Sequence, residues 1–596
     1  MTEKRLNWGL WGLGFFSLLL TEKASGFVRD EGIYFVSAES YARWWQAFLR
    51  APSQAIADGV IVQSWAVNSE HPALLKTLFG ISWLIFHEGL GWLRDAAAFR
   101  LPSFAFAALI LPLTYQFAKP IAGRIPAIFA ALTFLLIPRQ FFESHLACFD
   151  VPVAALWVLV VFCFWKAQTE KRWWLYTGLA FGAAIASKHN ALFLPFVLSP
   201  IGGVRAWLLT KDKPEARETG LRLVLVFVFG AVLFLVMFVA MGLQRFGQTF
   251  EPLGPQVGLY LAMIGGGGAL VWRLFRQDEA TARTLAPLWA MAALGPLIFY
   301  VSWPYLWHHP VERASAYLAF HATHNHYAWY YLGEMLRAPP FPLFYVVGKT
   351  ALTVPTSLFV PMVFGFLWLV VRAVRKQITF LEVLIGVNAV ASIAIISHPN
   401  VPHFGGVKHW FPSMPFLAAL MGSSLTRAAD AASIWLLQVR KQAWAQPEKV
   451  ALLLCVLCGV PALIQGVRIY PYGTSAYAEA AGGLPGAAAM GMQRQFWSNN
   501  VTGVLEWINQ NAKPGERIYL HEVTGDSIRH YQRNGMLRAD IGFTGGPWDA
   551  DIVAYQYHQE FREHEFNAWQ ALGTVKPVYG LYVDETPQVI VYRRAR

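Results

Sequence analysis

Long apolar segments separated by short polar connections fill the first four-fifths of the chain. Each is near the ~20 residues that an α-helix needs to cross a bilayer. Because some are short, one or two of these helices could be re-entrant. The pattern predicts thirteen apolar helices, near residues 6–21, 99–118, 124–138, 149–166, 173–187, 190–209, 221–241, 256–275, 284–303, 344–371, 379–397, 410–427 and 449–467. We therefore expect a polytopic α-helical membrane domain over residues 1–467.

Composition supports this class of protein. Hydrophobic residues make up 56% of the 596 residues and charged residues only 14%, whereas soluble proteins carry about 25% charged residues. The mean hydropathy is +0.38. The 25 tryptophans suit a protein with many membrane interfaces. The four cysteines lie in or beside apolar segments and are expected to be small core residues, not a disulfide framework or a metal site.

The distribution of Lys and Arg predicts the orientation. If the N-terminus is cytoplasmic, the cytoplasmic connections hold most of the Lys and Arg of the short loops. The short connections on the opposite side hold only Arg139, Lys188, Arg245 and Lys408. The positive-inside rule therefore places the N-terminus inside and, with thirteen spans, the C-terminus outside. This asymmetry accounts for the net charge of +12 without a nucleic-acid partner.

The last part of the chain has a different pattern. From residue 468 to residue 596, short β-rich runs such as "DIVAYQY" alternate with amphipathic runs such as "TGVLEWINQN". This alternation predicts a small extracytoplasmic α/β domain. It contains no glycine-rich phosphate loop and no metal-ligand spacing. We expect an accessory role for it, such as acceptor binding.

The polar residues of interest all fall on the predicted outer face. In the first outer loop, residues 22–98, Asp30 and Glu31 begin an aromatic amphipathic helix that is expected to lie in the lipid boundary. Glu70 and His71 begin a second such helix. The alternative for both is a solvated or capped helix start. A catalytic role instead requires these carboxylates to face a common cavity.

Four further outer connections carry ionisable groups. "FFESHLACFDVP" contains Glu143 and Asp150, although Asp150 could simply cap a helix. Lys188 lies between two spans, where a lysine often extends toward the interface. Lys408 and His409 follow a Gly-Gly turn that could bind an anion. Five histidines between residues 308 and 326 leave a metal site as an alternative, with His321 and His324 one helical turn apart.

Carboxylates and cations at one membrane face suit sugar transfer from a polyprenyl-phosphate donor. The donor lipid stays in the membrane, so the reaction must take place at the interface. The phosphate leaving group requires nearby cations. The acceptor hydroxyl is a weak nucleophile, so a carboxylate must take its proton.

Five motifs occur in the order of a known family. They are "RDEGIY", "EHPALLK", "FRLPS", "HLACFDVP" and "IASKHNALFLP". In them the chain resembles the integral-membrane glycosyltransferase family of the protein O-mannosyltransferases and the bacterial aminoarabinose transferases of lipid A, over most of residues 1–470. The resemblance implies the C-type glycosyltransferase fold and an inverting transfer from a dolichyl- or undecaprenyl-phosphate sugar, without a nucleotide sugar.

The resemblance also implies roles for single residues. Asp30 would be the general base, with Glu31 beside it shaping the site. Substrate would be bound by the polar residues of the other motifs and outer connections: Glu70, His71, Arg100, Glu143, Asp150, Lys188, Lys408 and His409. Arg100, Lys188 and Lys408 would be the candidates for the phosphate. The aminoarabinose transferases carry a lysine where this chain has His71, which weakens the transfer of that phosphate assignment.

Two other functions remain open at this point. A lipid or sugar transporter would place ionisable residues in mid-span with access to both faces. An oligosaccharyltransferase-like enzyme would need a divalent metal and a peptide-reading domain. For the glycosyltransferase we expect no metal or other cofactor. Its partners would be membrane lipid, the lipid-linked donor and a hydroxyl acceptor on protein, lipid or glycan. Its setting would be the bacterial inner membrane, with the site on the periplasmic face.

Overall fold

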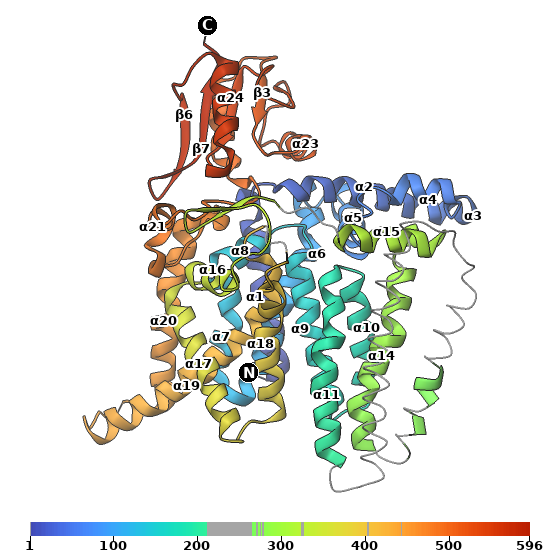
Figure 1. Cartoon of the computed structure of the whole chain (residues 1–596), viewed down its shortest axis with the longest axis vertical. Coiled ribbons are helices and arrows are strands. Elements are labelled where there is room, and N and C mark those ends of the chain that lie inside the picture. The colour runs from blue at the N-terminus through green and yellow to red at the C-terminus, as the bar shows by residue number, and fades with distance from the viewer. Residues whose placement is uncertain are drawn as a thin grey trace.

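The computed structural model describes residues 2–210, 265–269, 272–273, 276, 279–322, 327–401, 405–442 and 444–595. A bundle of apolar helices forms its body, and helices cross one end of the bundle beneath a C-terminal sheet (Figure 1). The bundle helices are α1 (Glu3–Thr21), α6 (Asp95–Ala122), α7 (Arg124–Leu136), α9 (Asp150–Ala167), α10 (Trp173–Ile185), α11 (Leu194–Thr210), α14 (Glu279–Val301), α17 (Thr356–Val374), α18 (Phe380–Ile396), α19 (Met414–Gln438) and α20 (Pro447–Ile469).

By length and composition, six apolar stretches among the described residues are able to cross a membrane, and they fall in α6, α9, α11, α14, α17 and α20. Helices α7, α10 and α18 are shorter apolar helices. The chain is thus a multi-pass membrane protein. Every predicted segment in the described part of the chain contains a helix. The segment near 221–241 and most of the segment near 256–275 lie outside the described residues.

One predicted span is wrong in its extent. The segment 344–371 is two helices, α16 (Tyr345–Thr353) and α17, not one. Val354 is extended, with φ −83° and ψ 130°, directly before Pro355. Proline has no backbone N–H, and it disfavours helical geometry in the residue before it. The helix therefore ends and restarts at this point.

Two ion pairs join residues of the predicted cytoplasmic connections to the starts of bundle helices at one end of the bundle. There Glu3 at the start of α1 pairs with Lys119 near the end of α6, and Lys171 pairs with Glu279 at the start of α14. At the start of α18, Thr379 and Glu382 form a capping box. The opposite end carries the polar connections of the predicted outer face.

Further helices cross this opposite end (Figure 1). They are α2 (Arg29–Arg50), α3 (Pro52–Ala55), α4 (Asp58–Trp65), α5 (Leu74–Trp83), α8 (Pro138–Glu143), α15 (Pro310–Ala322) and α16. The aromatic face of α2 does not face lipid, contrary to the expectation. Phe35 and Tyr41 are fully buried and Trp44 nearly so, because α4, α5 and the C-terminal segment cover that face.

The C-terminal segment contains the predicted mixture of helices and strands. Its sheet has the order β4-β3-β5-β7-β6, with β3 parallel to β4 and β5, and β7 antiparallel to β5 and β6. The elements are α21 (Gly483–Ala489), α22 (Thr502–Asn511), β3 (Arg517–Leu520), α23 (Gly525–Arg533), β4 (Gly542–Phe543), β5 (Ile552–Gln556), α24 (Arg562–Leu572), β6 (Tyr579–Val583) and β7 (Thr586–Arg593). A separate hairpin pairs β1 (Trp329–Tyr331) with β2 (Glu334–Leu336).

Helix α23 fixes this segment to the bundle. Asp95 at the start of α6 accepts hydrogen bonds from His530 at 3.0 Å and from Arg533 at 2.7 Å. The Tyr531 hydroxyl contacts the backbone of Phe27. These contacts place the sheet above the start of α2.

Candidate active site

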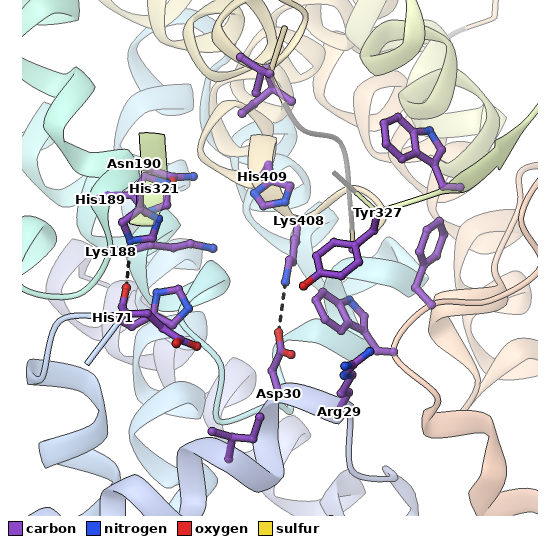
Figure 2. Close-up of a pocket in the computed structure, with 18 of the residues that line it drawn as sticks. Arg29, Asp30, His71, Lys188, His189, Asn190, His321, Tyr327, Lys408 and His409 are labelled. Atoms are coloured by element: carbon purple, nitrogen blue, oxygen red, sulfur yellow. Dashed lines mark hydrogen bonds and ion pairs between the residues drawn. The ribbon is translucent and has the colours of Figure 1, made fainter. Parts of the chain in front are cut away.

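A cavity of about 570 Å³ lies between the bundle and the C-terminal segment. Its walls come from the start of α2, the connection before α5, the α10–α11 connection, α15, the turn before α19 and the C-terminal segment. Figure 2 shows that Asp30, Lys188 and Lys408 point toward the same space from three of these elements. Six of the predicted site residues line the cavity: Asp30, Glu70, His71, Lys188, Lys408 and His409.

The centre of the site is a carboxylate that faces lysine ammonium groups. Lys408 Nζ lies 3.9 Å from Asp30 Oδ2. Behind it, Asp150 Oδ1 accepts a hydrogen bond from Lys188 Nζ at 2.6 Å, and Asp150 Oδ2 lies 3.7 Å from Lys408 Nζ. Asp150 is 4% exposed and does not line the cavity. Asp150 therefore pairs with both lysines on the side that faces away from the cavity.

The capping alternative for Asp150 is wrong. Phe149 is the N-cap residue of α9, and Asp150 is the first helical residue. Its carboxylate is engaged by the two lysines and not by the backbone of the helix start.

Burial and neighbouring charges change the pKa values of Asp30 and Lys408. Burial raises the pKa of Asp30 above its ordinary 3.8, and the Lys408 ammonium offsets part of that rise. Burial alone would lower the pKa of Lys408, but Asp150, Asp30 and Glu143 outweigh it and raise that pKa. Lys408 thus stays charged, and Asp30 is a stronger base than an ordinary aspartate.

A buried lysine shapes the wall that carries Glu70 and His71. Lys76 Nζ donates to the carbonyl oxygens of Asn68, at 2.6 Å, and of His71, at 3.0 Å. Asn68 Nδ2 in turn donates to Glu70 Oε1 at 2.8 Å. Burial lowers the pKa of Lys76 to about 7. Lys76 therefore organises this loop from outside the cavity.

Three histidine rings lie side by side at the same wall. The ring centroids of His189 and His321 are 3.9 Å apart, and those of His71 and His321 are 5.7 Å apart. His321 Nε2 contacts the carbonyl oxygen of Glu70. Among the described residues, no group of three or more His, Cys, Asp or Glu side chains could hold a metal ion. His324, the second member of the metal alternative, lies outside the described residues.

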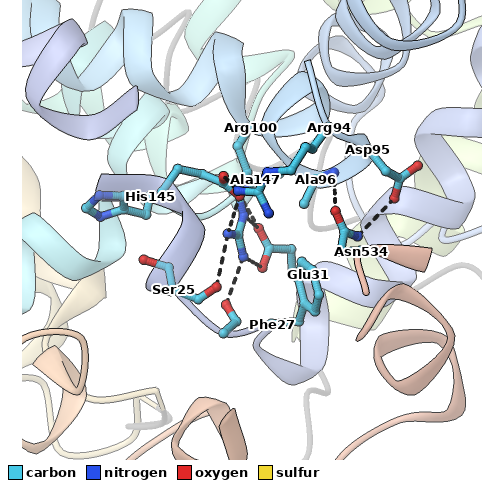
Figure 3. Close-up of polar contacts among 12 residues, drawn as sticks. Ser25, Phe27, Glu31, Arg94, Asp95, Ala96, Arg100, His145, Ala147 and Asn534 are labelled. Carbon is cyan, nitrogen blue, oxygen red and sulfur yellow. Dashed lines mark hydrogen bonds and ion pairs between the residues drawn. The ribbon is translucent and has the colours of Figure 1, made fainter. Parts of the chain in front are cut away.

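Two predicted site residues form a structural ion pair instead. Arg100 donates to both carboxylate oxygens of Glu31, at 2.7 and 2.6 Å, and to Glu22 at 3.1 Å (Figure 3). Glu31 Oε1 also accepts the backbone N–H of Ala147. Arg100 and Glu31 are fully buried and do not line the cavity. We correct both assignments: Glu31 follows Asp30 by one residue on α2, so its side chain points to a different face of the helix, and Arg100 has no path to a phosphate in the cavity.

Glu143 also lies outside the main cavity. It lines a small adjacent pocket with Arg139, Gly405 and Gly406. Burial raises the pKa of Glu143 to about 8, and Lys408 offsets part of that rise. Glu143 is therefore mostly protonated at neutral pH and adds little charge beside Lys408.

Several cavity residues were not predicted from the sequence. The C-terminal segment supplies Phe496, Trp497, Glu522 and Glu560. Arg29 lines the cavity and pairs with Glu522 at 3.1 Å. Only Arg29, beside Asp30, carried a local signal in the sequence. The others lie in separate loops that tertiary packing brings together.

The comparison with protein families agrees with the sequence motifs. Residues 71–242 match the model of the dolichyl-phosphate-mannose-protein mannosyltransferase family. No curated protein matches the chain. Among solved structures, ArnT from Cupriavidus metallidurans bound to undecaprenyl phosphate is 15% identical, with a TM-score of 0.44 and coverage of 98% of each chain.

A second similar structure is the archaeal oligosaccharyltransferase AglB from Archaeoglobus fulgidus in complex with an inhibitory peptide and a dolichol-phosphate. It is 12% identical, with a TM-score of 0.45, and the alignment covers 95% of this chain and 71% of that one. The family match over residues 71–242 confirms the predicted resemblance to the glycosyltransferase family of the protein O-mannosyltransferases.

Proposed function

We propose that the chain transfers a sugar from a polyprenyl-phosphate donor to a hydroxyl acceptor on the outer face of the membrane, with inversion at the anomeric carbon. One observation carries this proposal: Asp30 lies 3.9 Å from Lys408 in a cavity at the outer end of the bundle, and Asp150 pairs with both Lys408 and Lys188. A carboxylate opposite paired cations suits a reaction that takes a proton and releases a phosphate.

In the proposed transfer, the acceptor hydroxyl displaces the phosphate at the anomeric carbon. The acceptor oxygen forms a bond to the anomeric carbon as the bond from that carbon to the phosphate oxygen breaks. The phosphate leaves with the bonding electrons, and the ammonium groups of Lys188 and Lys408 stabilise its charge. Asp30 takes the acceptor proton. Glu70, His71 and His409 line the same cavity and would contact the sugar or the acceptor.

The proposal extends to the setting of the reaction. Residues 1–467 would hold the donor, and residues 468–596 would complete the acceptor side of the cavity. The arrangement of Lys and Arg at the opposite end of the bundle supports a cavity on the periplasmic face of a bacterial inner membrane. The acceptor would be a hydroxyl of a protein, lipid or glycan. The ionisable groups at the outer ends of the helices favour this enzyme over a transporter.

Removal of either cavity lysine is expected to weaken the binding of a lipid phosphate. A hydrogen bond to a charged group is worth ~1.5–3 kcal/mol, or about a ten- to hundredfold change in affinity. Thermal stabilisation of the purified protein by undecaprenyl phosphate or dolichyl phosphate measures this for K188A and K408A. The exposed Lys513 provides the control variant K513A. Wild-type binding by folded K188A and K408A would contradict the proposed phosphate site.

The transfer rate is expected to fall on the acid side of its pH profile, at a midpoint above pH 3.8. The base works only when ionised, and burial raises the pKa of Asp30 above 3.8. Because the Lys408 ammonium lowers that pKa, K408M should move the midpoint further upward. Transfer rates between pH 4 and 9 with a donor that the wild type accepts provide the measurement. A downward shift in K408M would contradict the assigned pair.

A further inference from the structure

A turn of the C-terminal segment, Trp497 and Ser498, touches both halves of the proposed reaction centre. Lys408 Nζ lies 3.5 Å from the centre of the Trp497 ring. The Trp497 carbonyl oxygen accepts the backbone N–H of Arg29 at 3.2 Å, one residue before Asp30. One residue therefore contacts the lysine through its side chain and the helix of the base through its backbone.

The surroundings hold this turn in an unusual conformation. Trp497 and Ser498 have φ angles of +70° and +63°, although neither is glycine. Such backbone conformations are costly, and they persist where the surrounding structure enforces them. Gln556, the fully buried last residue of β5, donates to the Ser498 carbonyl oxygen at 3.2 Å. The sheet thus fixes the turn.

The Gly-Gly turn before Lys408 is shaped to receive the indole ring. A Cβ atom on Gly405 would lie 2.3 Å from Trp497 Cζ2 and 2.6 Å from Lys408 Cε. Only glycine allows so close an approach, and its φ of +70° favours glycine as well. The Trp497 indole ring therefore packs against Gly405, next to the aliphatic part of the Lys408 side chain.

We propose that Trp497 is a positioning residue that sets Lys408 opposite Asp30, so that the C-terminal segment is an integral part of the reaction centre. A cation held over an indole face is attracted by the ring, most strongly where water is excluded, and Lys408 is 6% exposed. This inference rests on the proposed function of Asp30 and Lys408.

The test uses the full chain with W497L, which removes the aromatic face, and W497F, which keeps a smaller one. Trp548 lies in the same segment and is 60% exposed, so W548L is the matched control. The first readout is thermal stabilisation by undecaprenyl phosphate. We expect W497L to weaken its binding by about tenfold and W497F by less. In a K408A background the loss from W497L should largely disappear, because the two residues act together.

The second readout is the pH profile of transfer. The charged groups that act on Asp30 are Lys408, Asp150, Arg29 and Lys188. A displaced Lys408 would lower the pKa of Asp30 less. The pH at which the transfer rate falls on the acid side should therefore rise in W497L, and by a smaller amount in W497F. A purely structural role would reduce the amount of folded protein without changing this pH.

Three outcomes overturn the inference. The first is a folded W497L with wild-type lipid-phosphate binding and a wild-type pH profile. The second is an equal loss of binding from W497L with and without Lys408, and the third is the same loss in W548L. Should W497L fail to fold, W497F decides, since wild-type values in W497F also contradict it. Full transfer by D30N would instead overturn the proposed function itself.

Discussion

Replacing Asp30 by asparagine is expected to lower the transfer rate by a factor of about 10²–10⁴, the usual contribution of a general base. Asparagine has nearly the same shape as aspartate but cannot take the acceptor proton. The Asp30 side chain is 29% exposed, and its ion pair among the described residues is the 3.9 Å contact with Lys408. The substitution should therefore leave the fold and the binding of the lipid phosphate intact.

The measurement is release of polyprenyl phosphate from a panel of polyprenyl-phosphate sugars by protein in proteoliposomes. D549N is a matched control, since the Asp549 side chain is 78% exposed in the C-terminal segment. We expect D30N to retain stabilisation by undecaprenyl phosphate while turnover is lost. Transfer by D30N at the rate of D549N would show that Asp30 is not the base.

Replacing Arg100 by methionine is expected to destabilise the protein severely. The change leaves the buried Glu31 without its cation and leaves the buried Glu22 with Arg94 as its remaining partner among the described residues. Breaking a buried ion pair by removing one partner costs about 3–5 kcal/mol. Little folded protein should then be recovered from the membrane, and the apparent unfolding temperature of any remaining protein should fall.

Fluorescence-detected size-exclusion chromatography and thermal unfolding in detergent measure this effect. R172M is the control, because Arg172 pairs with Glu170 on the surface and is 71% exposed. D30N and R100M together distinguish the roles of Asp30 and Glu31. D30N should lose turnover, whereas R100M, which removes the partner of Glu31, should lose the fold. If R100M is as stable as R172M and fails only in lipid-phosphate binding, Arg100 belongs to the substrate site after all.

The elements of the fold followed closely from the sequence because their signals are local. Apolar segments of sufficient length predicted the bundle helices, and alternating short patterns predicted α22, α23 and the main strands of the C-terminal sheet. Pro355 was the local signal that the 344–371 prediction overlooked. Strand β4 is only two residues long and left no pattern to detect.

The site was harder to predict because its residues come from segments that are far apart in the sequence. Asp30 and Glu31 look equivalent in the sequence, but neighbouring helical residues point about 100° apart, so one reaches the cavity and the other reaches Arg100. The roles of Asp150 and Lys76 depend on partners 38 and 8 residues away. Nothing near Trp497 in the sequence indicates that its ring lies against Lys408.

The most direct test of the proposed lipid-phosphate site is a cryo-electron microscopy structure of the purified chain with undecaprenyl phosphate. The proposed function predicts that the phosphate lies within hydrogen-bonding distance of Lys188 Nζ and Lys408 Nζ, with Asp30 across the cavity and the polyprenyl chain leaving between bundle helices. A phosphate bound elsewhere, with Lys188 still paired with Asp150 and Lys408 still beside Asp30 and Asp150, would contradict it.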